Sequence, residues 1–467
     1  MSLQTTTPFP WNRLPRELRL MIMEELSDLV PSAGRNPLSC WASVSIEWYL
    51  YFTPFIWHTI TLQVSAAHSD IDEFNQLAVF HRKRLVVNIS LHMSLQEYTC
   101  QECGQVESAE TIEANNLTFS NALKGLFCAL SGWTRDPSTA GIALELSASS
   151  PSDSRHLELD LVEHRRELAN QSPGHLISNA KKRLLGQLLD FESKMSDLPE
   201  VAVIERLSVR QRLLRNLSAS SLNVIICNLP RLHHINYEPW LWTDKKGQRR
   251  REIANTNLLR WAACRSTLRS IAIWEAQSEK LHKNRCYSKP YDNNLTSAAV
   301  QASFHLNALA ISHATDAMDF FLRFDEASEA TQCTGTPPRL SLRHLALTCR
   351  LQMPPESPTE VNNLLFVASK AAMQLPHLEV MEVWSPGVGE GFFFRYEVKK
   401  RQAKLVVGAT WRISRMQNSA VFKAWQRVAG RHADYDLEYA FKSINAGELK
   451  QPWSICRHLR LRDCLRE

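Results

Sequence analysis

The chain contains few of the residues that interrupt or cross-link a fold. Only 15 of its 467 residues are Gly and 21 are Pro, which excludes the low-complexity and collagen-like classes. Its 11 Cys residues are an odd number and lack the regular spacing of a disulfide framework. We therefore expect reduced thiols and an intracellular protein, located in the cytoplasm, the nucleus or both.

Long apolar segments are also missing. No uncharged apolar run approaches the roughly 18 residues that a membrane-spanning helix needs. The first residues lack a basic segment followed by an apolar one, so we expect no signal peptide and no membrane partner. Lys and Arg number 54 against 48 Asp and Glu, a net charge of +6. This excess is too small to indicate a nucleic-acid-binding protein.

Sequence signatures of catalysis are a third absence. There is no GxSxG nucleophile turn, no GxxxxGK(S/T) phosphate loop and no HExxH metal helix. Cys100 and Cys103 form one CxxC, and a tetrahedral zinc site would need two more ligands, with His92 and Cys128 as candidates. Because no second CxxC is present, incidental spacing is favoured. We expect no metal, no cofactor and no enzymatic activity.

Two amphipathic helices are predicted within the first sixty residues. Apolar residues recur at helical spacings of three and four at Leu14, Leu18, Met21, Ile22 and Leu26. Pro15 lies in the first turn, where the N–H that it lacks would have had no partner. A second helix is predicted over residues 38–48, after a Pro- and Gly-containing segment at residues 30–37.

The order and spacing of these residues follow a known pattern. Its elements are Leu14-Pro15, Glu17-Leu18, Ile22, Leu26, the run 42–45, Trp48 and the run 55–57. The pattern resembles the F-box of filamentous-fungal proteins. This resemblance implies a small helical bundle that binds an Skp-type adaptor and, through it, a cullin–RING ubiquitin ligase. It implies adaptor contacts for Leu14, Pro15, Leu18, Ile22, Leu26, Val44 and Trp48. The alternative is a helical hairpin that only caps the rest of the chain.

The remainder of the chain contains a repeated strand-like string. The strings centre on Leu207, Ile235, Ile271, Leu309, Leu345 and Met381. Helical stretches precede most of them, at residues 218–229, 255–264, 297–305 and 359–375. Successive centres are 28 to 38 residues apart by subtraction, longer than the roughly 20 to 29 residues of regular leucine-rich repeats. The repeat resembles an irregular leucine-rich repeat, whose stacked units bury a shared core and present an extended face to a partner protein.

These patterns predict an α/β (α+β) chain of two parts. An F-box-like domain occupies residues 8–62, and an irregular strand–helix solenoid that is leucine-rich-repeat-like occupies residues 63–467. Earlier strands are predicted at 85–93 and 142–147, and a long surface loop at 148–180. The C-terminal part is predicted to hold a hairpin of 392–398 with 403–411, a helix at 419–429 and a final strand at 455–463.

Aromatic residues follow several of the predicted strands. The five that we single out are Tyr237, Trp240, Trp242, Trp274 and Trp384. At the carboxyl ends of strands they would reach the rim of the extended face, where Trp and Tyr often anchor a partner protein. We therefore name them as target-binding candidates. The second interpretation, packing in the interior of a wide solenoid, stays open.

The most basic segment is KKGQRRR, residues 245–251. It is either a nuclear-targeting or phosphate-contacting segment, or a solvated loop between two repeat units. The loop is favoured because no aromatic stacking residues accompany the charges. A second basic segment, residues 399–404, coincides with the expected hairpin turn.

The sequence thus predicts a substrate receptor of an SCF-type ubiquitin ligase. The N-terminal helices would bind the adaptor and the body an unidentified target protein, while other subunits transfer ubiquitin. The alternative is a ligase-independent protein-interaction scaffold or a nuclear factor.

Overall fold

The computed structural model describes the greater part of the chain. The described residues are 11–29, 38–99, 101–102, 105–136, 138–157, 183–185, 187–191, 197–242, 245–275, 293–332, 340–351, 358–411, 420–433 and 436–461. Within these ranges, no helix combines the length and the hydrophobicity needed to cross a membrane.

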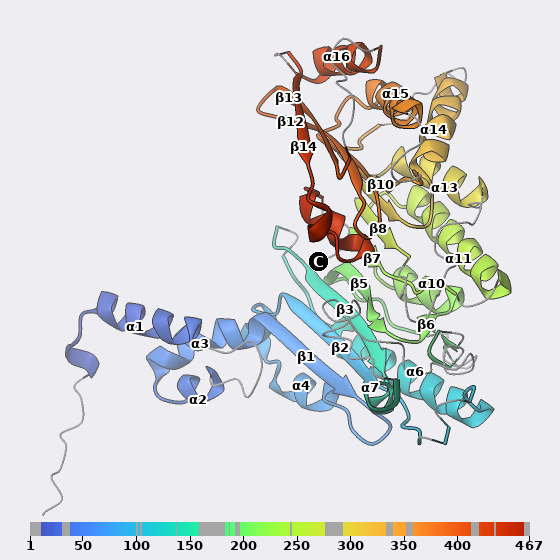
Figure 1. The fold of residues 1–467 in the computed structure, drawn as a ribbon. Helices are drawn as coiled ribbons and strands as arrows, with labels where there is room; N and C mark the ends of the chain where they lie inside the picture. Colours follow the sequence, from blue (N-terminus) through green and yellow to red (C-terminus); the bar gives the residue numbers. More distant parts are fainter. Residues whose placement is uncertain are drawn as a thin grey trace, which may run out of the picture.

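Four short helices form the N-terminal part. They are η1 (Trp11–Arg13), α1 (Arg16–Asp28), α2 (Leu38–Ala42) and α3 (Ile46–His58). The prediction of one helix over 38–48 is wrong, because α2 ends at Ala42 and Ser45 caps the start of α3. Its hydroxyl accepts the N–H of Trp48 at 3.3 Å. Figure 1 shows these helices standing out to one side of the sheet.

One large sheet carries the rest of the chain. Its strands follow sequence order: β1 (Thr59–Val64), β2 (Asn88–Ser94), β3 (Ile142–Ser149), β5 (Ile204–Leu213), β7 (His234–Tyr237), β8 (Ser270–Trp274), β9 (Ala308–Ser312), β10 (His344–Thr348), β11 (Val380–Ser385), β12 (Phe392–Lys399), β13 (Gln402–Ala409) and β14 (Glu438–Ser443). Neighbours are parallel except around β12, which is antiparallel to both β11 and β13. A separate small sheet joins β4 (Leu188–Leu189) to β6 (Asn216–Leu217).

Helices connect the parallel strands. They are α4 (Ile71–Leu77), α5 (Phe80–Lys83), α6 (Ala109–Ser131), α7 (Pro151–Leu157), α10 (Ala219–Cys227), α11 (Lys245–Cys264), α13 (Asn293–Ser303), α14 (Ala317–Gln332), α15 (Pro358–Gln374) and α16 (Ala420–His432). The long ones, from α6 to α15, lie along one face of the sheet (Figure 1). The prediction of a mixed α/β fold is confirmed.

The six predicted strand centres lie side by side in the sheet. Leu207 pairs with Ile235, which pairs with Ile271. The same row continues through Leu309, Leu345 and Met381. All six side chains are buried in the core between sheet and helices. These strand predictions are therefore confirmed, and the repeat of about 36 residues corresponds to one strand and its returning helix.

The opposite face of the sheet is covered over its C-terminal part by the end of the chain. Two 3₁₀ helices, η2 (Ala446–Glu448) and η3 (Pro452–His458), lie there. Leu449, Ile455 and Leu459 pack in a second apolar cluster that includes Trp384 and Phe393 from the strands. The sheet therefore has apolar cores on both faces in this region.

A buried carboxyl group fastens this C-terminal segment to the sheet. Glu382, in the middle of β11, is fully buried. Its two oxygens accept the N–H groups of Arg460, at 2.7 Å, and Leu461, at 2.8 Å. Arg395 of β12 lies 3.4 Å away and balances the charge. These contacts explain why the segment runs across the sheet.

Several predicted elements of the body need correction. The final strand predicted at 455–463 is wrong, because residues 455–458 belong to η3 and the last strand is β14. The predicted loop at 148–180 begins with the end of β3 and α7, and its residues 158–180 lie outside the described ranges. The helix α14 was not predicted.

The hairpin of β12 and β13 is confirmed. Its two-residue turn has positive φ at both Lys400 (50°) and Arg401 (64°), as the tight turns of hairpins require. At the other end of the chain, the predicted boundary between residues 62 and 63 falls inside β1, which pairs with β2 over its full length.

Replacing Glu382 should detach the C-terminal segment. We expect Glu382→Ala to lower the free energy of unfolding by about 3 kcal/mol, because two buried N–H groups lose their acceptor and Arg395 loses a counter-charge. Urea unfolding followed by tryptophan fluorescence measures this. The control is Glu438→Ala on β14, where an exposed ion pair with Lys404 contributes at most about 1 kcal/mol. Equal losses in both variants would contradict the role given to Glu382.

Candidate functional site

Exposed apolar side chains are concentrated on the N-terminal helices. In the described part of the chain, twenty large hydrophobic side chains are exposed, and nine of them lie between residues 18 and 55. They are Leu18, Leu20, Met21, Ile22, Leu29, Val44, Ile46, Leu50 and Phe55. Clustered exposure of this kind is typical of a surface that a partner protein covers.

The helix α1 exposes an apolar stripe, which consists of Leu18, Met21 and Ile22. Leu18, Met21 and Ile22 are 45%, 58% and 39% exposed, whereas Met23 is fully buried. Met23 packs with Phe52 and other residues of α2 and α3 in a small core of its own. A unit of three short helices has too little interior to enclose both sides of α1. The stripe is therefore left free on its outer side.

Polar and aromatic contacts hold these helices together behind the stripe. Arg19 of α1 forms an ion pair of 2.8 Å with Glu47 of α3. The same carboxylate accepts the indole N–H of Trp11 at 3.0 Å. Trp48 lies against both Trp11 and Phe52, with ring centroids 5.3 and 5.6 Å apart. The exposed surface is thus supported by fixed helices.

The helix α3 joins this unit to the sheet without a linker, because β1 begins directly after it. Trp57 at its end stacks on Phe74 of α4, at a centroid distance of 6.4 Å. Nearer the start of α3, the Tyr49 hydroxyl accepts a hydrogen bond from Arg82 of α5 at 3.3 Å. The same hydroxyl lies 3.2 Å from the ring of His81, also in α5. These contacts set the direction in which the N-terminal helices project (Figure 1).

The seven predicted adaptor-contact residues fall into three groups. Pro15, Leu18, Ile22 and Val44 are exposed, and Val44, in the turn between α2 and α3, is 61% exposed. Leu14 is half-buried. Leu26 and Trp48 are half-buried and pack in the interior of the helical unit. Leu50 and Phe55 of α3 are exposed as well. They are not among the predicted contacts, because the second predicted helix ends at residue 48.

The five aromatic target-binding candidates are in the interior. Tyr237, Trp240, Trp242, Trp274 and Trp384 are between 0% and 8% exposed. Trp274 and Trp384 stack on each other at 5.5 Å, although their strands are separated by β9 and β10. Buried side chains do not reach a partner protein from this position. The prediction of an exposed rim is therefore corrected in favour of packing.

The basic segment at 245–251 is the start of a helix and not a loop. It forms the first turns of α11, and only part of it is solvated: Lys245, Lys246, Arg249 and Arg250 are exposed. Arg251 is buried and donates a hydrogen bond to the Tyr237 hydroxyl. Gln248 is also buried and donates to the carboxyl group of Glu275 at 2.8 Å. The favoured interpretation as a solvated loop is wrong, because this helix packs one side of the segment into the fold.

No metal site is visible in the described residues. They contain no group of three or more His, Cys, Asp or Glu residues that could hold a metal ion. The predicted ligand pair, Cys100 and Cys103, lies outside the described ranges. Of the residues suggested to complete it, His92 contacts the Ser147 hydroxyl at 3.0 Å and Cys128 is an exposed free thiol on α6.

Comparison with known proteins gives one match. Residues 263–465 match a family of unknown function, DUF6546. This segment runs from the end of α11 past η3, so the N-terminal helices lie outside it. No curated protein matches the chain, and no solved structure does. The match gives no evidence for an F-box or a leucine-rich repeat, and both remain predictions.

Glu275 should make stability depend on pH. Burial raises its pKa from an ordinary 4.5 to about 7, although Gln248 and Arg251 act in the opposite direction. The folded state therefore keeps a proton that the unfolded state releases above pH 4.5. Unfolding free energy should fall as pH rises from 4.5 through 7, by about 3 kcal/mol at about 1.4 kcal/mol per pH unit.

The variant Glu275→Gln keeps an acceptor for Gln248 and carries no charge. Relative to the unmodified chain, we expect it to gain less than about 1 kcal/mol at pH 5 and about 3 kcal/mol at pH 8. Urea unfolding at the two pH values measures the gain. An exposed carboxyl group changed in the same way, Glu326→Gln on α14, is the matched control. A gain that does not grow with pH would contradict the assignment.

Proposed function

We propose that this protein is an F-box substrate receptor of an SCF-type cullin–RING ubiquitin ligase. Its N-terminal helices bind an Skp-type adaptor and its body binds a target protein. The observation that carries the proposal is the exposed apolar stripe of α1, together with Val44 in the adjoining turn. Four of the residues that match the adaptor-facing positions of an F-box lie on this surface: Pro15, Leu18, Ile22 and Val44.

The energetics of this surface fit an adaptor interface. Completely burying one Leu, Ile or Val side chain is worth roughly 1.5 to 3 kcal/mol. Only part of each side chain remains to be buried, because Leu18, Ile22 and Val44 are 39% to 61% exposed. Covering each of them with a partner would therefore contribute roughly 1 kcal/mol to the binding free energy. A partner protein would stabilise such a surface by covering it, whereas the uncovered surface promotes aggregation.

The arrangement of the body supports a receptor role. Parallel strands in sequence order, with helices along one face, are the arrangement expected of an irregular leucine-rich-repeat-like array. Since α3 continues directly into β1, an adaptor bound to the N-terminal helices would be held in a defined orientation to the sheet. In this proposal the chain has no catalytic group, and other subunits of the ligase transfer ubiquitin in the cytoplasm or the nucleus.

One observation favours the alternative of a ligase-independent scaffold or nuclear factor. Four basic side chains at the start of α11 are exposed, although their segment is partly packed. A nuclear-import receptor or a nucleic acid would recognise such charges. Binding of nucleic acid that is lost at high salt, and lost when Arg249 and Arg250 are replaced by Gln, would support this alternative.

A binding measurement with a purified Skp-type adaptor tests the proposed function. We expect the full chain to be retained by immobilised adaptor, and the double variant Leu18→Asp, Ile22→Asp to bind at least about tenfold more weakly. Two carboxylates in an apolar interface cost well over the 1.4 kcal/mol that corresponds to tenfold.

The matched control is the double variant Leu322→Asp, Phe366→Asp. These side chains are 47% and 41% exposed on α14 and α15, close to the values for Leu18 and Ile22. The control should bind like the unmodified chain, and circular dichroism should show that both variants are folded. No retention of the unmodified chain, or equal retention of all three proteins, would refute the proposal.

A further inference from the structure

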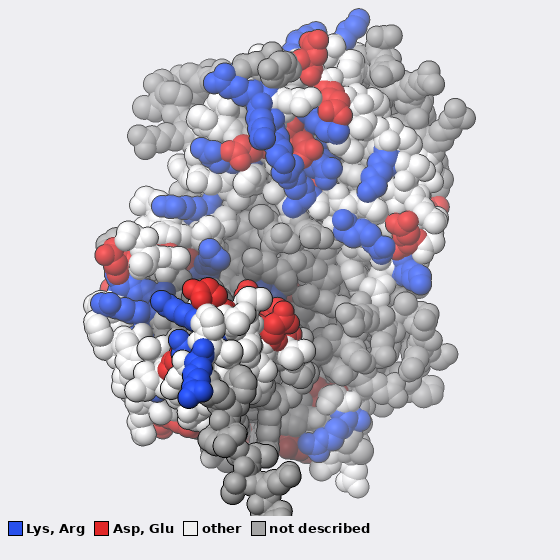
Figure 2. Space-filling model, turned by 90° about the vertical axis from the view of Figure 1, so that its left-hand side faces the viewer, with Lys and Arg blue, Asp and Glu red and all other residues white. Residues whose placement is uncertain are grey.

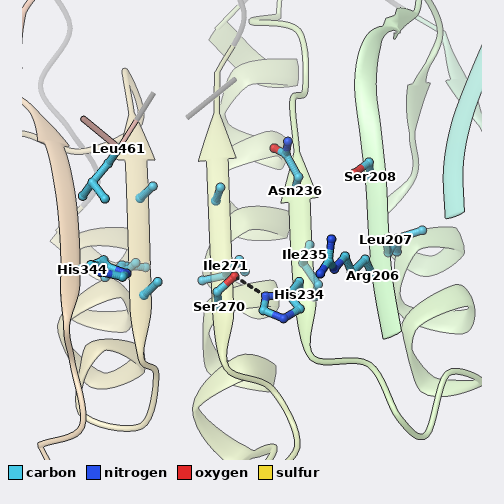
Figure 3. A pocket seen from close by; sticks show the side chains of 14 residues that line it. Arg206, Leu207, Ser208, His234, Ile235, Asn236, Ser270, Ile271, His344 and Leu461 are labelled. Carbon is cyan, nitrogen blue, oxygen red and sulfur yellow. Dashed lines mark hydrogen bonds between the residues drawn. The ribbon is translucent and has the colours of Figure 1, made fainter. Parts of the chain in front are cut away.

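A groove lies on the sheet face opposite the long helices. It has a volume of about 290 Å³ and crosses the strands from β5 to β10 (Figure 3). Its floor consists of small side chains, with Ala272 on β8 and Ala308 and Ala310 on β9. Leu461, from the C-terminal segment held by Glu382, lines the groove as well.

The strand register explains which side chains meet in the groove. Arg206, His234 and Ser270 occupy one row across adjacent strands. Ser208 and Asn236 belong to the next row. Alternate residues of a strand point to opposite faces, so these polar groups share a face while Leu207 and Ile235 point into the helix-covered core. In Figure 3, Arg206 and His234 approach each other at one side of the floor.

Two of these groups lack a partner. Arg206 is exposed, and its side chain has no hydrogen bond or ion pair with any of the described residues. The neighbouring arginines differ: Arg231 pairs with Glu205, and Arg210 lies 3.4 Å from Glu145. The side-chain oxygen of Asn236 is buried and accepts no hydrogen bond in the described part of the chain. The groove thus has a cation without a partner in one row and, in the next row, a buried acceptor without one.

The third polar group, His234, is neutral at pH 7. Burial, together with the charges of Arg206, His233 and Arg269, lowers its pKa from 6.5 to about 4. Its Nδ1 lies 3.0 Å from the Ser270 hydroxyl, which fixes the ring (Figure 3). A neutral imidazole offers one donor and one acceptor. It therefore adds polarity to the wall without repelling either kind of ligand.

The charge of the lining selects the ligand. None of the residues that line the groove is Asp or Glu. Two nearby carboxyl groups already have partners. Glu379 pairs with Arg343 and lies 3.4 Å from His344 of the lining, and Glu382 accepts hydrogen bonds from the C-terminal segment. A guanidinium pairs best with a carboxylate or phosphate, whereas the buried oxygen of Asn236 needs an N–H donor. An acidic peptide supplies both, a carboxylate from its side chain and N–H groups from its backbone.

Size points in the same direction. A volume near 290 Å³ is at the lower end of the range for ligand sites, about 300 to 1,000 Å³. It takes one or two amino-acid side chains and the backbone between them. The alanine floor allows a peptide backbone to approach the sheet closely.

We propose, on the premise of the proposed function, that this groove binds an acidic segment of the target protein. A Glu or Asp carboxylate of that segment pairs with Arg206, and a backbone N–H donates to the side-chain oxygen of Asn236. In this proposal, the receptor recognises acidic peptides.

Fluorescence anisotropy with the full chain tests this directly. The probe is a fluorescein-labelled octapeptide in which Glu alternates with Ala, and its comparison is the same peptide with Gln in place of Glu. We expect the Glu peptide to bind about tenfold more tightly, as one charged hydrogen-bonded pair implies. Arg206→Gln should remove this difference. Arg427→Gln, the same change at an exposed position on α16, should preserve it.

Three outcomes would overturn the proposal. One is equal binding of the Glu and Gln peptides, and another is the same loss in Arg206→Gln and Arg427→Gln. The third is displacement of the peptide by acetate or by an oligo(dT) octamer at concentrations equal to the peptide's, which would assign the groove to small carboxylates or to nucleic acid. The peptide measurement contains no adaptor. A negative result for the peptide therefore does not change the expected result of the adaptor-binding experiment.

Discussion

The parallel register of six strands is the constraint on which the rest of the body depends. Leu207, Ile235, Ile271 and the residues paired with them form one buried row, with a helix returning the chain after most strands. Because side chains alternate between faces, this row fixes the identity of the residues on the other face as well. A shift of one strand by one residue would bury Arg206 or His234 among the helices. The position of the groove is thus a consequence of the same register that builds the core.

Charged side chains are buried in this fold where groups of opposite charge lie within hydrogen-bond distance. Arg215 is almost fully buried, yet it lies 2.8 Å from Glu107 and 3.3 Å from Asp153. The Tyr98 hydroxyl donates to that same aspartate at 2.9 Å. On the upper part of the face seen in Figure 2, blue and red side chains lie close together. Arg460 also has a partner, because it forms an ion pair with Glu397. Arg206 differs from Arg215 and Arg460, because no described residue accepts a hydrogen bond from its side chain.

The two surfaces proposed for binding have different physical origins. The N-terminal helices expose Leu18, Met21 and Ile22 because a unit of that size has only one small interior. The groove is polar and lies beside the C-terminal segment, which Glu382 fastens to the sheet. The helix α3, which continues directly into β1, holds the two surfaces in a fixed relation. An interaction protein that joins an adaptor to a target needs such a relation.

The sequence by itself determined the elements and their repeat. Hydrophobic periodicity located the six strand centres, the helix after Pro15 and the β12–β13 hairpin, because these patterns depend on neighbours within one strand or helix. Only the tertiary structure decided which faces are buried. Trp384 is an interior residue because β11 lies under the C-terminal segment, and Arg251 is buried because α11 packs against Tyr237. Leu18 is exposed because no described part of the chain packs over the outer side of α1. Such outcomes depend on contacts between residues far apart in the chain, and a local pattern carries no information about them.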